Sequence, residues 1–180
     1  MADADRVLKF MEKNSWKLFH FAAYTDWPEE TIKVLIKTVQ IQNPNKADFQ
    51  ELACVLGWPV DKLYKLMTSS DNINAVDKHC RTSLHIAANR DNYRFVRQLV
   101  KLKSVNVNAV DEKGQTALHY AAKQGHGRVV TALCLHHTDA NIKTPGSGGK
   151  TALHYAAVEG HAHIIRMLVR HGRANLTIAN

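Results

Sequence analysis

The chain has few cysteines and no long apolar segment. Its three cysteines, Cys54, Cys80 and Cys134, are odd in number and lie in different sequence contexts, which argues against a disulfide framework. No uninterrupted apolar run reaches the roughly 18 residues of a membrane-spanning helix, and residues 1–6 lack the basic and apolar regions of a secretion signal. We therefore expect a protein of the cytoplasm or the nucleus that does not bind membranes.

Acidic residues are scarce in the C-terminal part of the chain. Residues 1–70 carry nine Lys/Arg and nine Asp/Glu, whereas residues 71–180 carry fifteen Lys/Arg and seven Asp/Glu, so the net charge of +8 arises in the second part. Such a basic surface accelerates association with acidic partners. The chain lacks a groove-reading helix and interleaved stacking aromatics, so we do not expect it to bind nucleic acid.

One block of seven residues recurs along the chain. The sequence Thr116-Ala-Leu-His-Tyr-Ala-Ala122 is repeated unchanged over residues 151–157, and a close variant spans residues 82–88. The first threonines of these blocks are 34 and then 35 residues apart, and the apolar residues that follow have helical spacing. A period of this length indicates a helix-turn-helix unit, and stacking of such units covers the apolar face that each leaves open. We predict an all-α solenoid.

These blocks, the Gly-His dipeptides at 125–126 and 160–161, and the trailing sequence Val107-Asn-Ala-Val-Asp111 resemble the ankyrin repeat. Two degenerate copies, marked by Ala22-Ala23 and Ala53-Cys54, precede the three clear ones. The resemblance covers roughly residues 15–180 and implies helix-turn-helix units joined by β-hairpin-like loops.

The resemblance divides the chain into six predicted segments. They are an N-terminal capping helix (1–14), a degenerate first repeat (15–47), a second repeat (48–81), a third (82–115), a fourth (116–150) and a fifth (151–180). The fifth ends after its second helix without a polar capping repeat, so we expect it to be truncated or to continue in a longer protein.

Six of the eleven histidines occupy only two repeat positions. They are His20, His85, His119 and His154 at the first position, and His126 and His161 at the second. The resemblance implies that the first set ties the start of a helix to neighbouring backbone. Because the spaced cysteine or carboxylate partners of a closed zinc site are missing, we predict no metal.

Two other features suggest catalysis without supporting it. The loop from Gly146 to Thr151 is similar to a phosphate-binding loop, but Thr144 stands where that motif requires glycine. Cys80 holds the hairpin position that Gly114 holds one repeat later, where a positive backbone φ is usual. No nucleophile, base and oxyanion donor come together in the pattern, so we predict no catalytic residue, no cofactor and no enzymatic activity.

In ankyrin stacks, hairpin tips and inner helices form a concave face that binds proteins. The family's geometry places on this face Lys78, His79, Arg81, Ile86, Asn89, Arg90, Glu112, Lys113, Gln115, Tyr120, Lys123, Gln124, Lys150, Tyr155, Val158 and Glu159. Six Lys/Arg and two Glu surround Tyr120 and Tyr155, which we expect to act as aromatic anchors within a basic rim. We predict a monomeric adaptor or scaffold that binds an acidic protein segment.

An alternative function is a substrate-targeting arm of a larger enzyme, or of a translocated bacterial effector, whose catalytic part is absent from these residues. The abrupt C-terminal end motivates it.

The terminal turns of three repeats also suggest a modification. Asn74, Asn108 and Asn141 resemble the targets of the asparaginyl hydroxylase that modifies ankyrin repeats, although each side chain also suits a turn brace.

Overall fold

The computed structural model describes residues 17–41, 46–58, 60–61, 73–136 and 149–171. In these segments every regular element is a helix, apart from isolated bridge residues such as the antiparallel pair Val76 and Thr82. The predicted all-α repeat solenoid is therefore confirmed. None of the helices in the described segments is long and apolar enough to cross a membrane. The predicted capping helix, residues 1–14, lies outside them.

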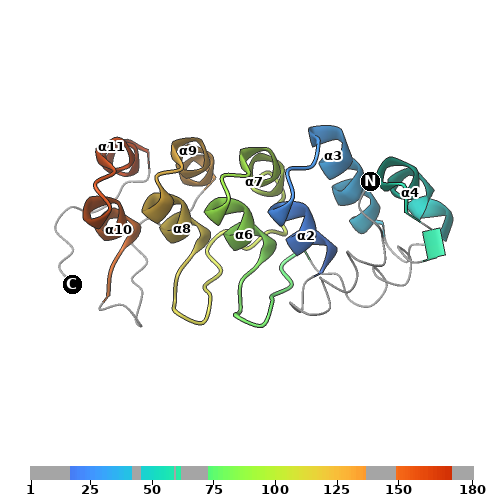
Figure 1. Ribbon diagram of the computed structural model, residues 1–180, viewed down its shortest axis with the longest axis horizontal. Helices are drawn as coiled ribbons and strands as arrows, with labels where there is room; N and C mark the ends of the chain where they lie inside the picture. The colour runs from blue at the N-terminus through green and yellow to red at the C-terminus, as the bar shows by residue number, and fades with distance from the viewer. Residues whose placement is uncertain (1–16, 42–45, 59, 62–72, 137–148, 172–180) are drawn as a thin grey trace.

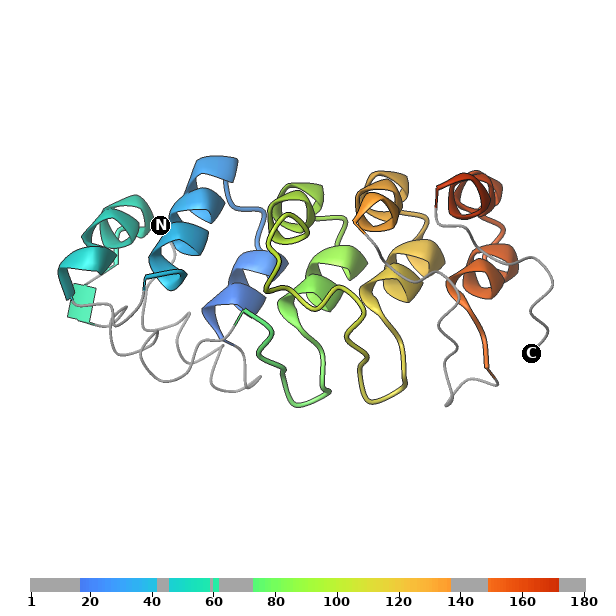
Figure 2. The ribbon, with the colours of Figure 1, turned by 180° about the vertical axis from the view of Figure 1, so that it is seen from behind.

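The helices form two rows along the long axis of the molecule (Figure 1). The inner row consists of α2 (Leu18–Tyr24), α6 (Ser83–Asn89), α8 (Ala117–Gln124) and α10 (Ala152–Val158). The outer row consists of α3 (Glu29–Val39), α7 (Tyr93–Leu99), α9 (Gly127–Leu135) and α11 (Ala162–Arg170). The hairpins that precede α6 and α8 project together to one side of the inner row (Figures 1 and 2).

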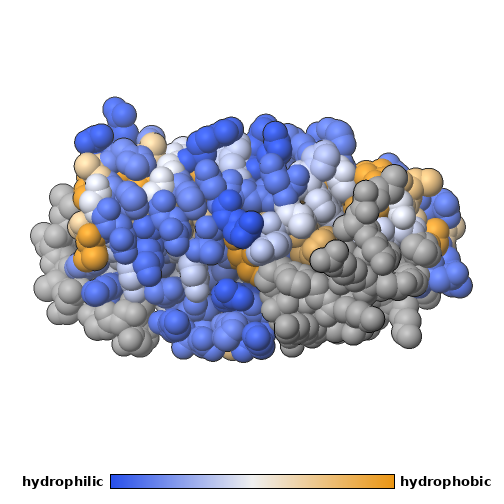
Figure 3. Space-filling model, in the orientation of Figure 1, coloured by the Kyte–Doolittle hydropathy of each residue, from blue (hydrophilic) through white to orange (hydrophobic). Residues whose placement is uncertain are grey.

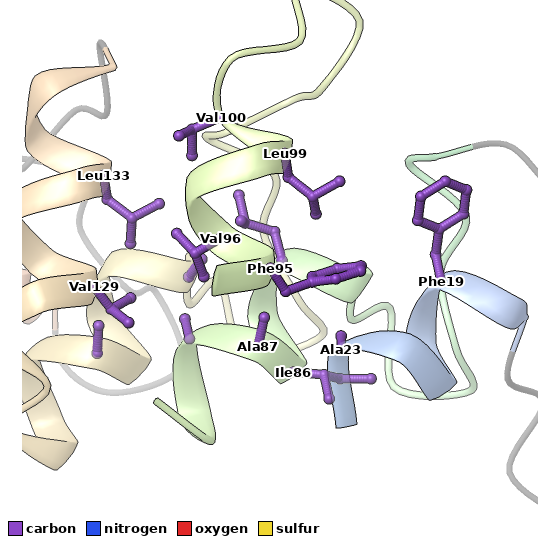
Figure 4. Packing of buried hydrophobic residues seen from close by; sticks show 14 of the residues in the cluster. Phe19, Ala23, Ile86, Ala87, Phe95, Val96, Leu99, Val100, Val129 and Leu133 are labelled. Carbon is purple, nitrogen blue, oxygen red and sulfur yellow. The ribbon is translucent and has the colours of Figure 1, made fainter. Parts of the chain in front are cut away.

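Small residues let the inner helices approach one another closely. The alanine pairs of α2, α6 and α8 are fully buried; they are Ala22 and Ala23, Ala87 and Ala88, and Ala121 and Ala122. Larger side chains of the outer row, such as Phe95 and Leu99 of α7 and Val129 of α9, fill the space above them (Figure 4). This close packing produces one continuous apolar core that no single helix pair could form.

The stacking order differs from the order of the sequence. Helix α2 packs directly against α6, and α3 packs against α7. The segment between them in sequence, with η1 (Lys46–Phe49) and α4 (Gln50–Leu56), packs instead on α3 at the end of the stack (Figures 1 and 2). The predicted second repeat, residues 48–81, therefore does not separate the first from the third, while the repeat boundaries themselves stay a prediction.

The side chains of α2 and α4 explain this order. Helix α2 carries His20, which is fully buried and whose Nε2 lies 3.0 Å from the Arg81 carbonyl oxygen before α6. At the matching position α4 carries Glu51, which is exposed and pairs with Lys37 of α3 at 3.2 Å. A carboxylate cannot donate the hydrogen bond that His20 makes, so only α2 fits the α6 surface.

Candidate functional site

A buried carboxylate braces the hairpin before α6. Asp77 Oδ1 accepts hydrogen bonds from the backbone N–H groups of His79 and Arg81 at 2.9 and 3.0 Å, and Oδ2 accepts two from the Arg81 guanidinium at 3.0 and 2.7 Å. Burial acts to raise the pKa of Asp77, but the hydrogen bonds outweigh it and lower that pKa below its ordinary value. Arg81 is therefore neutralised within the chain.

The next hairpin uses the same brace with a different outer partner. Asp111 Oδ1 accepts from the backbone N–H groups of Lys113 and Gln115, both at 2.8 Å, and the Tyr120 hydroxyl donates to Oδ2 at 2.7 Å. Burial, and then the hydrogen bond to Asp111, raise the pKa of Tyr120. The Tyr120 ring is thus held at a fixed orientation on the hairpin side of α8.

The first histidine position ties each repeat to the next. The Thr82 backbone N–H donates to His85 Nδ1 at 3.0 Å, so the ring proton lies on Nε2, which donates to the Gln115 carbonyl at 3.0 Å. His20 makes the same link to the Arg81 carbonyl. Burial lowers the pKa of both imidazoles. The predicted structural role is confirmed for these two histidines.

The residues immediately before α7, α9 and α11 make a tie in the opposite direction. Asn92 Nδ2 donates to carbonyls at the end of α2, at 3.1 to 3.4 Å. One repeat later, His126 Nε2 lies 3.2 Å from the Asn89 carbonyl oxygen, and His161 Nε2 lies 3.0 Å from that of Lys123. The C-terminal ends of α2, α6 and α8 are thus each held by a side chain that precedes an outer helix of the neighbouring repeat.

Between α2, α6 and α8 the surface is hollowed. The hollow is lined by aromatic side chains of α2 and α8 and by residues of α6 and its preceding hairpin; they are Tyr24, Arg81, His85, Ile86, Asn89, Arg90 and Tyr120. The Arg90 guanidinium carbon lies 3.9 Å from the centre of the Tyr24 ring. Such a stacked guanidinium is immobilised while its N–H edge stays available.

The structure brings most of the predicted site residues to one surface, which we call the hairpin face. It consists of the exposed and half-buried residues of the two hairpins, of α6, α8 and α10, and of the turns that follow them. Exposed there are Lys78, Asn89, Arg90, Glu112, Lys113, Lys123, Gln124, Val158 and Glu159, and half-buried are His79, Arg81, Gln115, Tyr120 and Lys150. Hydrophilic residues cover the hairpins in Figure 3.

Two predicted contact residues are buried. Ile86 is 4% exposed and Tyr155 is 8% exposed. The Tyr155 hydroxyl accepts a hydrogen bond from Gln115 Nε2 at 2.9 Å, and its ring packs edge-on against His119. The prediction of two equivalent aromatic anchors was therefore wrong for Tyr155, because its ring fills the junction between α8 and α10.

Tyr24 lines the hollow but is missing from the predicted residues. It follows the alanine pair of α2, as Asn89 and Lys123 follow those of α6 and α8. The repeat register therefore identifies Tyr24 as a member of the same row. The predicted set was drawn from the third to the fifth repeats and the hairpin before the third, and therefore did not include Tyr24.

Positive charge on the hairpin face is only partly compensated. Among the described residues, Lys78, Arg90, Lys113 and Lys123 have no ion pair. The carboxylates of the two hairpins already bind other side chains of the same chain. These pairs are Asp77 with Arg81, Asp111 with Tyr120, and Glu112 with His79 at 3.1 Å. The face therefore presents four solvent-exposed cations that no carboxylate of the described residues pairs with.

The side chain of Asn74, one of the three predicted modification sites, braces the backbone of the next repeat. Asn74 Nδ2 donates to the Ser104 carbonyl at 2.6 Å, and its Oδ1 accepts from the Asn106 backbone N–H at 2.8 Å. Asn108 is half-buried, and Asn141 lies outside the described residues. Hydroxylation of these residues stays a prediction.

The described residues contain no cluster of three or more His, Cys, Asp or Glu side chains that could hold a metal ion. Cys80 is exposed and has the positive φ predicted for its hairpin position, 57°. Burial raises the pKa of Cys134 to about 11, which suppresses its thiolate. The first half of the loop similar to a phosphate-binding loop, from Gly146 to Gly148, lies outside the described part.

Comparison with protein-family models gives two matches. A model described as ankyrin repeats in three copies matches residues 52–145, and a model of the single ankyrin repeat matches residues 148–180. A search of curated proteins gave no match.

Proposed function

Because the chain belongs to the ankyrin repeat family, whose repeats are generally protein–protein interaction modules, we propose that its hairpin face binds an acidic segment of a partner protein. Ankyrin repeat domains are typically non-catalytic, and the proposed role is that of an adaptor or scaffold in the cytoplasm or the nucleus. Within the proposal the protein acts as a monomer.

The uncompensated cations of the hairpin face carry this proposal. Lys113 lies at the tip of the second hairpin and Lys123 near the end of α8; both are exposed and neither has an ion pair among the described residues. Tyr120 lies between them on the same helix and is held by Asp111. A fixed aromatic ring within a basic surface suits an acidic segment that also carries apolar side chains.

Competing cations on the outer helices provide a matched control. In the described residues, α7, α9 and α11 carry Arg94, Arg97, Arg128, Arg166 and Arg170, and no acidic residue. Arg94 pairs with Asp26 and Arg97 with Glu29, whereas the other three have no ion pair among the described residues, so the outer helices also present uncompensated positive charge. What distinguishes the hairpin face is the combination of cations with Tyr120 and the hollow.

The proposal is tested by affinity capture from cell lysate with a Tyr120→Ala/Lys123→Glu variant beside wild type. We expect loss of at least one specific partner from this variant, while Arg166→Glu/Arg170→Glu on α11 retains it. Circular dichroism and thermal melting establish that both variants are folded. Retention by the first variant with loss from the second would move the binding surface to the outer helices.

A further inference from the structure

The hollow between α2, α6 and α8 contains an arginine that is oriented but not neutralised. The Arg90 guanidinium stacks over the Tyr24 ring at 3.9 Å, and in the described residues Arg90 has no ion pair. Stacking covers one face of the guanidinium plane and leaves the N–H groups at its edge. An arginine in this state has already lost much of its side-chain freedom before a ligand arrives.

No residue that lines the hollow brings a carboxylate to Arg90, and the carboxylate of the next residue in the chain, Asp91, lies 3.9 Å from His126 Nδ1. Arg81, the other guanidinium of the hollow, is bound to Asp77 through two hydrogen bonds. Burial favours the neutral form of His85, both ring nitrogens of which are hydrogen-bonded within the chain, and the Tyr120 hydroxyl already donates to Asp111. The hollow therefore has one unsatisfied positive group, bordered by two aromatic rings.

We propose that this hollow receives the carboxylate side chain of an Asp or Glu in the partner's acidic segment, paired with the Arg90 guanidinium. The proposal rests on the function proposed above and identifies one anchoring residue within it. A carboxylate matches the N–H edge of a guanidinium with two parallel hydrogen bonds, which a lysine ammonium cannot reproduce. The Tyr24 and Tyr120 rings border this pair and offer apolar surface to a residue beside the acid.

The chain contains an arginine that controls for stacking and charge. The Arg128 guanidinium carbon lies 4.2 Å from the centre of the Tyr93 ring, but this pair joins the outer helices α9 and α7. Arg128→Ala removes the same charge and the same kind of stacked contact as Arg90→Ala. Only Arg90 lies in the hollow.

The experiment is selection from a displayed random peptide library, with wild type, Arg90→Ala, Arg90→Lys and Arg128→Ala as separate baits. We expect wild type and Arg128→Ala to enrich peptides that share an Asp or Glu beside an apolar residue. Arg90→Ala should lose that preference, and the wild-type peptides should bind it at least about tenfold more weakly. Arg90→Lys should bind them less tightly than wild type, because it keeps the charge without the paired hydrogen bonds.

A coupling measurement then locates the contact. Replacing the shared acidic residue of a selected peptide by Asn or Gln should weaken binding to wild type and have little further effect on Arg90→Ala. Equal enrichment of acidic peptides by Arg90→Ala and wild type would overturn the inference, as would failure of wild type to enrich peptides above an unrelated bait.

The two proposals fail in distinguishable ways. If selected peptides lack a shared acid but lose affinity for Tyr120→Ala, the hairpin face binds peptides and the role of Arg90 is wrong. If neither Tyr120→Ala nor Arg90→Ala weakens them, the hairpin face is not the binding surface. Because Arg90 is exposed, its variants should keep wild-type helicity and melting, which circular dichroism checks.

Discussion

The junction of α2 with α6 and the junction of α6 with α8 use the same interactions across different lengths of chain. In both, an imidazole Nε2 lies 3.0 Å from a carbonyl oxygen of the next hairpin. His20 and Arg81 are 61 residues apart, whereas His85 and Gln115 are 30 apart. Chain separation therefore does not decide which helices become neighbours.

The energetics of loop closure explain this tolerance. Doubling the length of a flexible loop costs only about 0.6 kcal/mol. A buried polar group left without its partner costs about 1–3 kcal/mol, and Arg81 and Asn92, which flank α6, make several such bonds to α2 and the residue after it. The fit of side chains thus outweighs sequence order. Helix α4, which lies between α3 and α6 in the sequence, packs on α3 at the N-terminal end of the stack and covers that end.

The largest effect is expected from a substitution in the segment that covers the end of the stack. It tests whether the N-terminal helices can unfold while the rest of the stack stays folded. Trp58 is 8% exposed and its ring centroid lies 6.3 Å from that of Phe21 on α2. We expect Trp58→Ala to destabilise the N-terminal part by about 3 kcal/mol, because a large cavity opens there. Hydrogen exchange should accelerate in α2, α3 and α4 and stay unchanged in α9, α10 and α11.

Val55→Ala serves as the control on α4. Val55 is 49% exposed, so its truncation should leave exchange rates in all helices close to wild type. Equal acceleration from α2 to α11 in Trp58→Ala would contradict a separable cover and indicate that the chain unfolds as one unit.

The next prediction compares the hydrogen bonds that Asn92 and His126 make to the end of the preceding inner helix at the two junctions. Asn92 is 6% exposed, accepts from the Phe95 backbone N–H and donates to carbonyls of α2. Asn92→Ala removes a helix cap and leaves buried carbonyls unsatisfied, so we expect a loss of about 2–3 kcal/mol in urea unfolding. His126→Ala removes a single hydrogen bond, which is more exposed to solvent than those of Asn92, and should cost about 1 kcal/mol. Equal losses would mean that the α2 junction is no tighter than the regular one.

The sequence predicted the clear repeats well because their local signals agree with their tertiary contacts. The block from Thr82 to Ala88 encodes the helix start, the buried alanines and the histidine tie within seven residues. The stacking of α2 on α6 is encoded by residues such as Phe19 and Asn92 that are far apart, and nothing local to either marks the pair. For the same reason the sequence predicted most of the residues that α6, its flanking residues and α8 contribute to the hollow, but not Tyr24 of α2.

The burial of Tyr155 shows another limit of the repeat register. Tyr120 and Tyr155 occupy identical positions in identical blocks, yet the first is half-buried and the second is 8% exposed. Gln115 accounts for part of the difference, since it donates to the Tyr155 hydroxyl, whereas Asp111 accepts from that of Tyr120. Matching positions therefore share backbone geometry without sharing exposure.

Two glycines sharpen the comparison of junctions at the C-terminal end. Gly125 and Gly160 have φ of 77° and 74°, but a Cβ on Gly125 would lie 2.8 Å from the His161 ring, whereas one on Gly160 meets nothing within 4 Å. We expect Gly160→Ala to cost about 1 kcal/mol from backbone strain alone. Gly125→Ala should cost about 2 kcal/mol, because it also displaces the imidazole that donates to the Lys123 carbonyl.

Thermal melting of the two glycine variants distinguishes these contributions. A difference of 1 kcal/mol corresponds to about 2–4 °C in Tm for a chain of this size. In a His161→Ala background, Gly125→Ala should lower the Tm by no more than Gly160→Ala lowers it. A persistent excess would place the strain in the backbone and not at the histidine.

The smallest expected effect is a pH dependence of stability that arises from the buried histidines, such as His85, whose Nε2 bonds to a carbonyl of the next hairpin. The folded-state pKa of His85 lies below its ordinary value of 6.5, so its contribution is fully present above that pH and is lost as pH falls towards the folded pKa. Protonation would remove the acceptor that the Thr82 N–H needs. We expect the Tm of wild type to fall between about pH 7 and about pH 5. This slope should be reduced in His85→Gln and largely kept in His154→Gln, because the described residues offer no backbone carbonyl to His154 Nε2. An unchanged slope in His85→Gln would show that the two junctions owe their acid sensitivity to other groups.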